Sequence, residues 1–187
     1  MAKRTTKYAT RTDAAIKQAL LSLLGKKRLS EVTVSELARD AHVSRSTFYE
    51  HFGNPVDVYD SIVEEFAHDL SPIMSQVACT SEMKPKGTPF CMRLRENGPF
   101  APAIGEDRFL NAFLNRDENL EGHDLFGILT EVGYTPEQAR AVCAFQFAGC
   151  FTAARMSNES DSDWQETKAV IDRFLLGGIA ACLAARR

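Results

Sequence analysis

The strongest constraint on the fold of this chain lies between Thr33 and Phe52, where two short helix patterns are separated by one tight turn. Thr33 and Glu36 form a capping box, in which the hydroxyl and the carboxylate each satisfy a backbone N–H at the start of a helix. The second helix has its own cap at Ser44. His42 precedes that cap, at a position where a turn often needs a left-handed backbone. The sequence therefore predicts a helix-turn-helix.

The second helix of this pair carries an unusual outward face. Phe48 and Phe52 are four residues apart and are expected to pack inward. The outward set is Ser44, Arg45, Ser46, Thr47, Tyr49, Glu50 and His51. A helix that enters the major groove, roughly 12 Å wide, needs a thin polar face of this kind. Arg45 can form two hydrogen bonds with guanine, and Thr47 can contact a base edge, whereas Tyr49 and His51 have the reach and the donors for phosphate oxygens.

Charge is divided unevenly along the chain, although the net charge is only −3. Residues 1–53 hold ten Lys/Arg against five Asp/Glu, whereas residues 54–187 hold twelve against twenty. A basic head on an acidic body is expected when only the head meets a polyanion. The cluster Lys26–Arg28 and the backbone N–H groups that follow Thr33 are further candidates for phosphate contacts. Double-stranded DNA is the predicted partner.

Helix start and stop signals continue along the chain, and no segment alternates as a strand would. The first helix is predicted over Thr12–Gly25, with Thr10 or Thr12 as its cap and Gly25 in a left-handed position after its end. Further helices are expected from Pro55 to about residue 77, over Phe90–Asn97, around Phe109–Leu114, over Gly122–Glu131, from Thr135 to about Met156, and from Ser162 toward the C-terminus. The predicted fold class is all-α. A three-helix DNA-binding domain is expected at residues 1–55, and a larger helical domain at 56–187, with the helix at about 55–77 linking the two.

Several classes of function lack their sequence signals. The five cysteines are odd in number and contain no CxxC pair, which argues against a disulfide framework and a zinc site. No Gly-rich phosphate loop, HExxH or GxSxG motif is present, so no catalytic residue, metal or cofactor is predicted. No apolar run approaches the ~18 residues that span a bilayer, and no secretory signal is seen, so we expect a cytoplasmic protein.

The segment from about Arg11 to Ile62 resembles the DNA-binding domain of TetR-family transcriptional regulators. The resemblance lies in the first amphipathic helix, in the T-V-S-E-L-A start of the second, and in V-S-R-S-T-F-Y-E-H-F. It implies a homodimer that binds an operator with two-fold symmetry and usually represses transcription. The positions that would contact DNA by this resemblance are Thr33, Ser44, Arg45, Ser46, Thr47, Tyr49 and His51. One departure is Gly53-Asn54-Pro55, where the family often has a lysine that meets a phosphate.

The rest of the chain resembles the family in outline only. By that outline the last two helices pack against those of a second copy, and Gly149, Ala153, Phe174, Gly178 and Cys182 are the candidate interface residues. Burial within one copy is the alternative interpretation. Candidate effector-binding residues are Phe109, Phe113, Phe126, Cys143, Phe147, Cys150 and Phe151, although an ordinary core position is the favoured interpretation of each aromatic.

The leading hypothesis is a sequence-specific regulator, a homodimeric repressor that a small apolar or amphipathic effector releases. Such an effector would change the angle of the fourth helix and so the separation of two recognition helices. An alternative hypothesis keeps the same DNA-binding head, but its activity is controlled by a partner protein, by cysteine oxidation or by a metal. A helical enzyme or a scaffold without DNA binding is the distant alternative.

Overall fold

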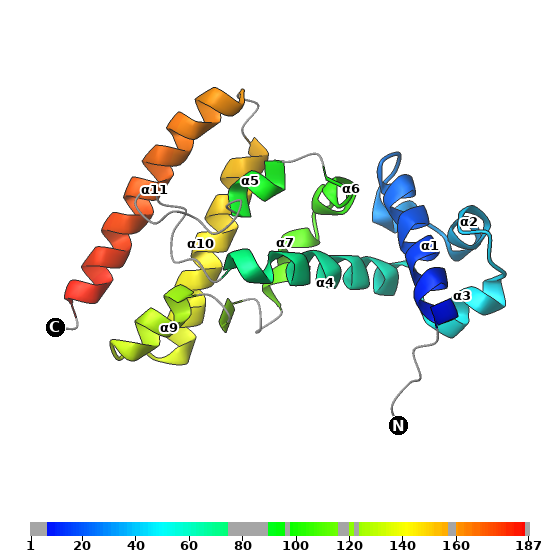
Figure 1. Ribbon diagram of the computed structural model, residues 1–187, viewed down its shortest axis with the longest axis horizontal. Coiled ribbons are helices and arrows are strands. Elements are labelled where there is room, and N and C mark those ends of the chain that lie inside the picture. The colour runs from blue at the N-terminus through cyan, green and yellow to red at the C-terminus, as the bar shows by residue number, and fades with distance from the viewer. Residues whose placement is uncertain are drawn as a thin grey trace. The chain divides into compact units, whose positions relative to one another are not determined.

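The computed structural model describes residues 7–74, 90–95, 98–115, 120–121, 124–156 and 160–185. Within these ranges every regular element is a helix, so the prediction of an all-α fold is confirmed (Figure 1). The elements are α1 (Lys7–Leu24), the 3-10 turn η1 (Leu29–Glu31), α2 (Val34–Asp40), α3 (Arg45–His51), α4 (Pro55–Met74), α5 (Phe90–Arg95), α6 (Ala101–Ile104), α7 (Phe109–Leu114), α9 (Asp124–Glu131), α10 (Pro136–Met156) and α11 (Asp161–Ala184). None of the described helices combines the length and apolar character of a membrane-spanning segment.

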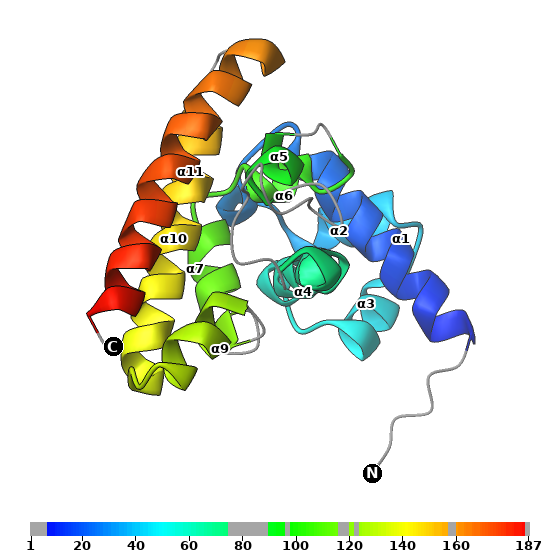
Figure 2. The ribbon, with the colours of Figure 1, turned by 60° about the vertical axis from the view of Figure 1, so that its left-hand side comes forward.

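The chain forms two compact units. The first contains the residues up to Phe66 together with Gly98–Ala112, and the second contains Ala67–Asn97 and Phe113–Arg187. In the first unit α2 and α3 lie against α1 (Figures 1 and 2). Its core is made by side chains with no exposed surface, Ile16, Leu20, Leu37 and Phe48. Burial of each such side chain contributes about 1.5–3 kcal/mol, which fixes the three helices as one body.

The first unit extends beyond the three-helix domain predicted at residues 1–55. The phenol of Tyr59 on α4 donates a 2.9 Å hydrogen bond to the carbonyl oxygen of Ala103 on α6. The ring of Phe66 makes edge contacts with Phe100 and Phe109, each with ring centroids 5.5 Å apart. These contacts join α4, as far as Phe66, to a segment more than thirty residues later in the chain.

In the second unit α10 packs against α5 and α9. Phe113 and Phe147 pair edge to face at 5.6 Å between centroids, and Trp164 of α11 is buried. The indole N–H of Trp164 donates to the sulfur of Met92 over 3.1 Å, and the guanidinium of Arg95 lies 4.7 Å from the indole centroid. α10 and α11 run antiparallel in both views (Figures 1 and 2).

Side chains cap α4 and α10 at their predicted starts. Asn54 caps α4, because its side-chain oxygen accepts from the backbone N–H groups of Val56 and Asp57 at 2.8 and 3.1 Å. Thr135 and Gln138 form a capping box at the predicted start of α10. The predicted linking helix runs from Pro55 to Met74, and its expected last turn, to residue 77, lies outside the described residues.

Three terminal assignments from sequence are wrong. α1 begins at Lys7, before the predicted Thr10 or Thr12 cap, because those two positions continue a helix that already exists. Gly25 is not left-handed; its N–H continues the helical pattern by bonding to the carbonyl of Leu21 at 3.3 Å. The cap of α11 is Ser160 rather than Ser162, since the Ser160 oxygen accepts from the N–H of Asp163.

Candidate nucleic-acid interface

The turn between α2 and α3 is built by a left-handed residue followed by a cap. His42 has φ 55°, and it is the residue other than glycine with positive φ in the described part of the chain. The turn closes with backbone bonds from His42 N–H to Arg39 and from Val43 N–H to Ala38, at 3.1 and 2.9 Å. Ser44 then accepts from the N–H of Thr47 at 3.0 Å. The predicted left-handed turn and the predicted cap are both confirmed.

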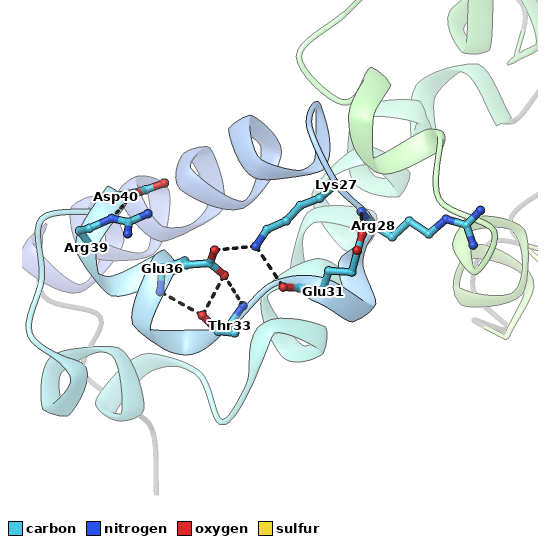
Figure 3. A network of polar contacts seen from close by, with 7 residues as sticks. All are labelled: Lys27, Arg28, Glu31, Thr33, Glu36, Arg39 and Asp40. Carbon is cyan, nitrogen blue, oxygen red and sulfur yellow. Dashed lines mark hydrogen bonds and ion pairs between the residues drawn. The ribbon is translucent and has the colours of Figure 1, made fainter.

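The start of α2 is held by a network that also reaches the loop before it (Figure 3). The Glu36 carboxylate accepts from the Thr33 N–H at 3.0 Å and from the Thr33 hydroxyl at 2.8 Å. Lys27 donates to Glu36 at 2.6 Å and to the carbonyl of Glu31 at 3.0 Å. These bonds from Lys27 and Thr33 lower the pKa of Glu36 to about 2. The network fixes where α2 begins relative to the end of α1.

The basic cluster Lys26–Arg28 is therefore not a uniform phosphate-binding patch. Lys27 is half-buried and engaged with Glu36, whereas the side chain of Arg28 points away from the network and is exposed (Figure 3). Lys26 is also exposed. Sequence analysis grouped the three by charge alone. The cap geometry, which places Glu36 beside Lys27, makes the middle residue structural.

The N-terminal turn of α3 carries a cluster of three hydroxyls. The Ser44 oxygen lies 2.7 Å from that of Ser46 and 2.9 Å from that of Thr47. Ser44 is therefore engaged in holding the helix start, while Ser46 is exposed and Thr47 is half-buried. Beyond this cluster Arg45 is exposed, and Tyr49 keeps 53% of its surface accessible. The long donors of the predicted recognition face thus point into solvent.

His51 has a different environment from the other predicted contact residues. Its Nδ1 lies 2.6 Å from a carboxylate oxygen of Asp13 on α1, and only 15% of its side chain is exposed. The pair fastens the C-terminal end of α3 to α1. Sequence analysis did not identify Asp13 as a partner, because thirty-eight residues separate the two and no local pattern connects them.

Two further charged groups border this surface. Arg39 on α2 has a side chain 70% exposed and pairs with the adjacent Asp40 at 2.9 Å, at the opposite end of α2 from Thr33 (Figure 3). At the start of α4, where the resemblance would place a lysine, the N–H of Gly53 donates to the carboxylate of Asp57 at 3.0 Å. A backbone N–H of Gly53 is thus already engaged, and an acidic group stands at this position.

The geometry, two short helices joined by a left-handed turn with the donors of α3 exposed, is that of a DNA-binding helix-turn-helix. The family model described as "Bacterial regulatory proteins, tetR family" matches residues 16–61. Residues 16–61 thus match the DNA-binding head of TetR-family regulators. The match covers α1 from its core residue Ile16, both helices of the head and the start of α4. The resemblance drawn from sequence is confirmed, and TetR-family proteins are regulators rather than enzymes.

Two solved structures are similar to this chain over most of its length. One is the TetR family repressor AlkX from Dietzia sp. strain DQ12-45-1b, implicated in biodegradation of n-alkanes. Its identity is 20% and its TM-score 0.45, covering 88% of this chain and 96% of that one. The other is TetR from Acinetobacter baumannii AYE, with 16% identity and a TM-score of 0.36, covering 91% and 93%.

The residues predicted to bind an effector do not all lie together. Phe109 belongs to the core of the first unit, against Phe66, whereas the other six belong to the second. There Phe113 and Phe147 form a buried pair, and Cys143 and Phe151 are also buried. Phe126 and Cys150 are half-buried. Burial raises the pKa of the Cys143 thiol to about 11, so at neutral pH this group is a small apolar side chain with a weak donor.

The residues predicted for a dimer interface lie on accessible faces of α10 and α11. Gly149, Phe174 and Gly178 are exposed, while Ala153 and Cys182 are half-buried. A shallow groove of about 490 Å³ follows α10 and is lined by Phe145, Ala148, Gly149, Thr152, Ala153 and Met156. Sequence analysis missed Phe145, which is 67% exposed, and Met156. Phe145 lies four residues before Gly149, and Met156 lies three residues after Ala153. This spacing places each pair on one face of a helix, and it could have identified both residues from the sequence.

Proposed function

We propose that the chain is a homodimeric repressor that binds a two-fold symmetric DNA operator through α2 and α3 and is released by a small apolar or amphipathic molecule. The observation that carries the DNA-reading part is the exposure of Arg45 and Tyr49 on a helix whose other side is anchored by buried Phe48. Arg45 would read a guanine in the major groove. Tyr49, with Ser46 and Thr47, would set the register on the phosphates and base edges.

Exposed apolar side chains on α10 and α11 support a second copy of this chain as the partner. Phe145, Met156, Val170, Phe174 and Leu176 are large hydrophobic side chains that are at least 40% exposed. A folded protein seldom leaves several large apolar side chains of one region in water, and a two-fold interface uses the same patch from both copies. Beside Gly149 and Gly178 the space is open, because a Cβ built at either meets no atom within 4 Å in one copy. With no side chain at these positions, the helix backbones of two copies could approach closely.

In the described part of the second unit, a buried side-chain oxygen on α10 lacks a hydrogen-bond partner. Gln146 on α10 is buried, and its side-chain oxygen has no hydrogen-bond partner. An acceptor left in this state costs about 1–3 kcal/mol, so it favours a ligand that brings a donor. Phe147 and Cys143 flank Gln146 on the same helix and are apolar in character. An effector with an apolar body and one hydroxyl or amine group fits this chemistry.

Control by thiol oxidation or by a metal has weaker support. A thiol with a pKa of about 11, as in Cys143, is almost entirely protonated at neutral pH and reacts slowly with oxidants. In the ranges that the structure describes, no three His, Cys, Asp or Glu side chains group as metal ligands. Cys79 lies outside those ranges. Serine replacement of each cysteine in turn, with unchanged regulation, would exclude thiol control.

Selection of bound duplexes from a random DNA pool tests the proposal. We expect an inverted repeat whose half-sites are separated by about one helical turn, ~34 Å, because each copy presents one α3. Binding should also weaken steeply with salt, as phosphate contacts release counterions. Enrichment of a single asymmetric half-site would contradict the dimer, and no enrichment at all would contradict sequence-specific reading.

A further inference from the structure

The pair of His51 and Asp13 has a chemical consequence for DNA binding. Nδ1 of His51 and Oδ1 of Asp13 are 2.6 Å apart. A carboxylate can only accept a hydrogen bond, so Nδ1 carries the hydrogen in this pair. A neutral ring in this tautomer has a bare Nε2, which accepts and does not donate. A phosphate oxygen is also an acceptor, so the neutral ring cannot bind a phosphate through Nε2.

We propose that Asp13 is a positioning residue for DNA binding and that His51 takes up one proton from solvent when its Nε2 meets a backbone phosphate. The imidazolium then donates from Nδ1 to the Asp13 carboxylate and from Nε2 to the phosphate. No bond other than N–H forms, and the charge gained on the ring lies between two anions. This inference rests on DNA binding by the head formed by α2 and α3.

The place of His51 on α3 agrees with this role. His51 follows Thr47 by four residues and Ser44 by seven, so the three side chains lie along one side of the helix. Ser44 and Thr47 form the hydroxyl cluster at the start of that side. The ring is held rather than free, because only 15% of the side chain is exposed. Asp13 would hold the His51 ring in one rotamer before DNA binds, so that less side-chain entropy is lost when the ring contacts a phosphate.

Several other charged groups on the elements around His51 have partners of their own. These are Lys17 with Glu65 at 2.6 Å, Arg39 with Asp40 at 2.9 Å, and Asp57 with the Gly53 N–H and the Asn54 amide at 3.0 Å each. Arg11 on α1 and Glu50 on α3 are exposed. Asp13 is the charged group in direct contact with the ring. Histidine is also the side chain whose charge ordinarily changes between about pH 5 and 8.

Fluorescence anisotropy with labelled duplex DNA of random sequence at low salt tests the proton uptake, because a phosphate contact does not depend on sequence. Between about pH 5.5 and 8 the wild-type affinity should rise on acidification more steeply than that of His51→Gln, by up to about tenfold per pH unit. His42→Asn is the matched control: asparagine tolerates the left-handed backbone, and the difference from His51→Gln should persist. Equal pH dependence of wild type and His51→Gln would overturn the inference.

The role of Asp13 needs a readout that a merely structural contact would not change. In the free protein, ¹⁵N NMR should show His51 as the Nδ1–H tautomer near pH ~8, with its signals assigned by their loss in His51→Gln. Asp13→Asn should flatten the pH dependence, and in the background of His51→Gln it should cause no further loss of DNA affinity. An Nε2–H tautomer, or additive losses in the double variant, would refute positioning by Asp13. A wild-type protein that binds no duplex would instead contradict the proposed function itself.

Discussion

At the scale of single residues, exposed and buried polar groups have opposite consequences. Arg45 is exposed on α3 and keeps its donors available for a partner. Gln146 is buried on α10 with an unpartnered oxygen, so its polarity costs stability unless something binds there. A side chain of the first kind contributes to recognition with little effect on folding. One of the second kind affects folding and binding together.

Arg45→Ala should relax the preference at one base of the selected site and weaken binding to that site by about 1–3 kcal/mol. The physical reason is the loss of two hydrogen bonds to one guanine. Titration of duplexes with each base at that position measures the effect. Arg173→Ala, at an exposed position of α11, is the control and should leave the preference intact. A uniform loss over all four bases would make Arg45 a phosphate contact.

Gln146→Met should increase the free energy of unfolding by about 1–3 kcal/mol, since it removes an unsatisfied acceptor while nearly keeping the side-chain volume. Urea unfolding of the full chain measures the change. The exposed Gln165 provides the control, and Gln165→Met should stay within about 0.5 kcal/mol of wild type. A destabilised Gln146→Met variant would show that the amide makes a favourable contact in the folded chain.

At the scale of elements, the short helix α2 depends on its first turn. A helix of seven residues is too short to be stable alone, so the cap and the packing of Leu37 decide whether it forms. Glu36 serves both the cap and the ion pair with Lys27. The same residue therefore fixes the helix start and the loop after α1.

Glu36→Gln should remove part of the acid sensitivity of the fold. The pKa of Glu36 falls from its usual 4.5 to about 2 on folding, so its ionised form contributes stability that is fully present above about pH 4.5. That contribution is lost as the pH falls toward 2. The gap in Tm between wild type and Glu36→Gln should thus be open near pH ~6 and narrow below pH ~4.5. Glu50→Gln, at an exposed site on α3, should show no such narrowing.

At the scale of the whole molecule, the second unit leaves its last two helices incompletely covered. Phe174 on α11 is 70% exposed, and a large aromatic side chain so open to solvent marks a candidate contact surface. On α10 the exposed Phe145 lines the shallow groove. Association of two copies would bury these side chains and would also bring two DNA-binding heads into one particle.

Phe174→Lys should convert the dimer to monomer and lower operator affinity by at least tenfold, because a lysine in the centre of an apolar interface leaves its charge unpaired. Sedimentation velocity measures the mass, and titration of the selected duplex measures the affinity. Gln165→Lys adds the same charge to an exposed site near the start of α11, and its mass should match that of wild type. A wild-type protein that sediments as a monomer, or a dimeric Phe174→Lys, would refute this interface.

Local patterns carried much of the prediction. The capping box at Thr33, the cap at Ser44, the left-handed His42 and the helix start at Thr135 are all confirmed, because each depends on atoms within a few residues. The predicted start of α1 at Thr10 or Thr12 is wrong, although it too was taken from a local pattern. A threonine that resembles a cap is also tolerated inside a helix, and only the continuing backbone bonds decide.

The sequence alone determined the helical class, the helix-turn-helix and the identity of its outward side chains, since helix periodicity and capping are short-range effects. Only the tertiary structure decided which of those side chains are already engaged. It placed Asp13 against His51, assigned Lys27 to Glu36, separated Phe109 from the other candidate effector residues, and left Phe145 and Phe174 in solvent. These outcomes depend on contacts between residues far apart in the chain, and no local pattern encodes which distant surfaces meet.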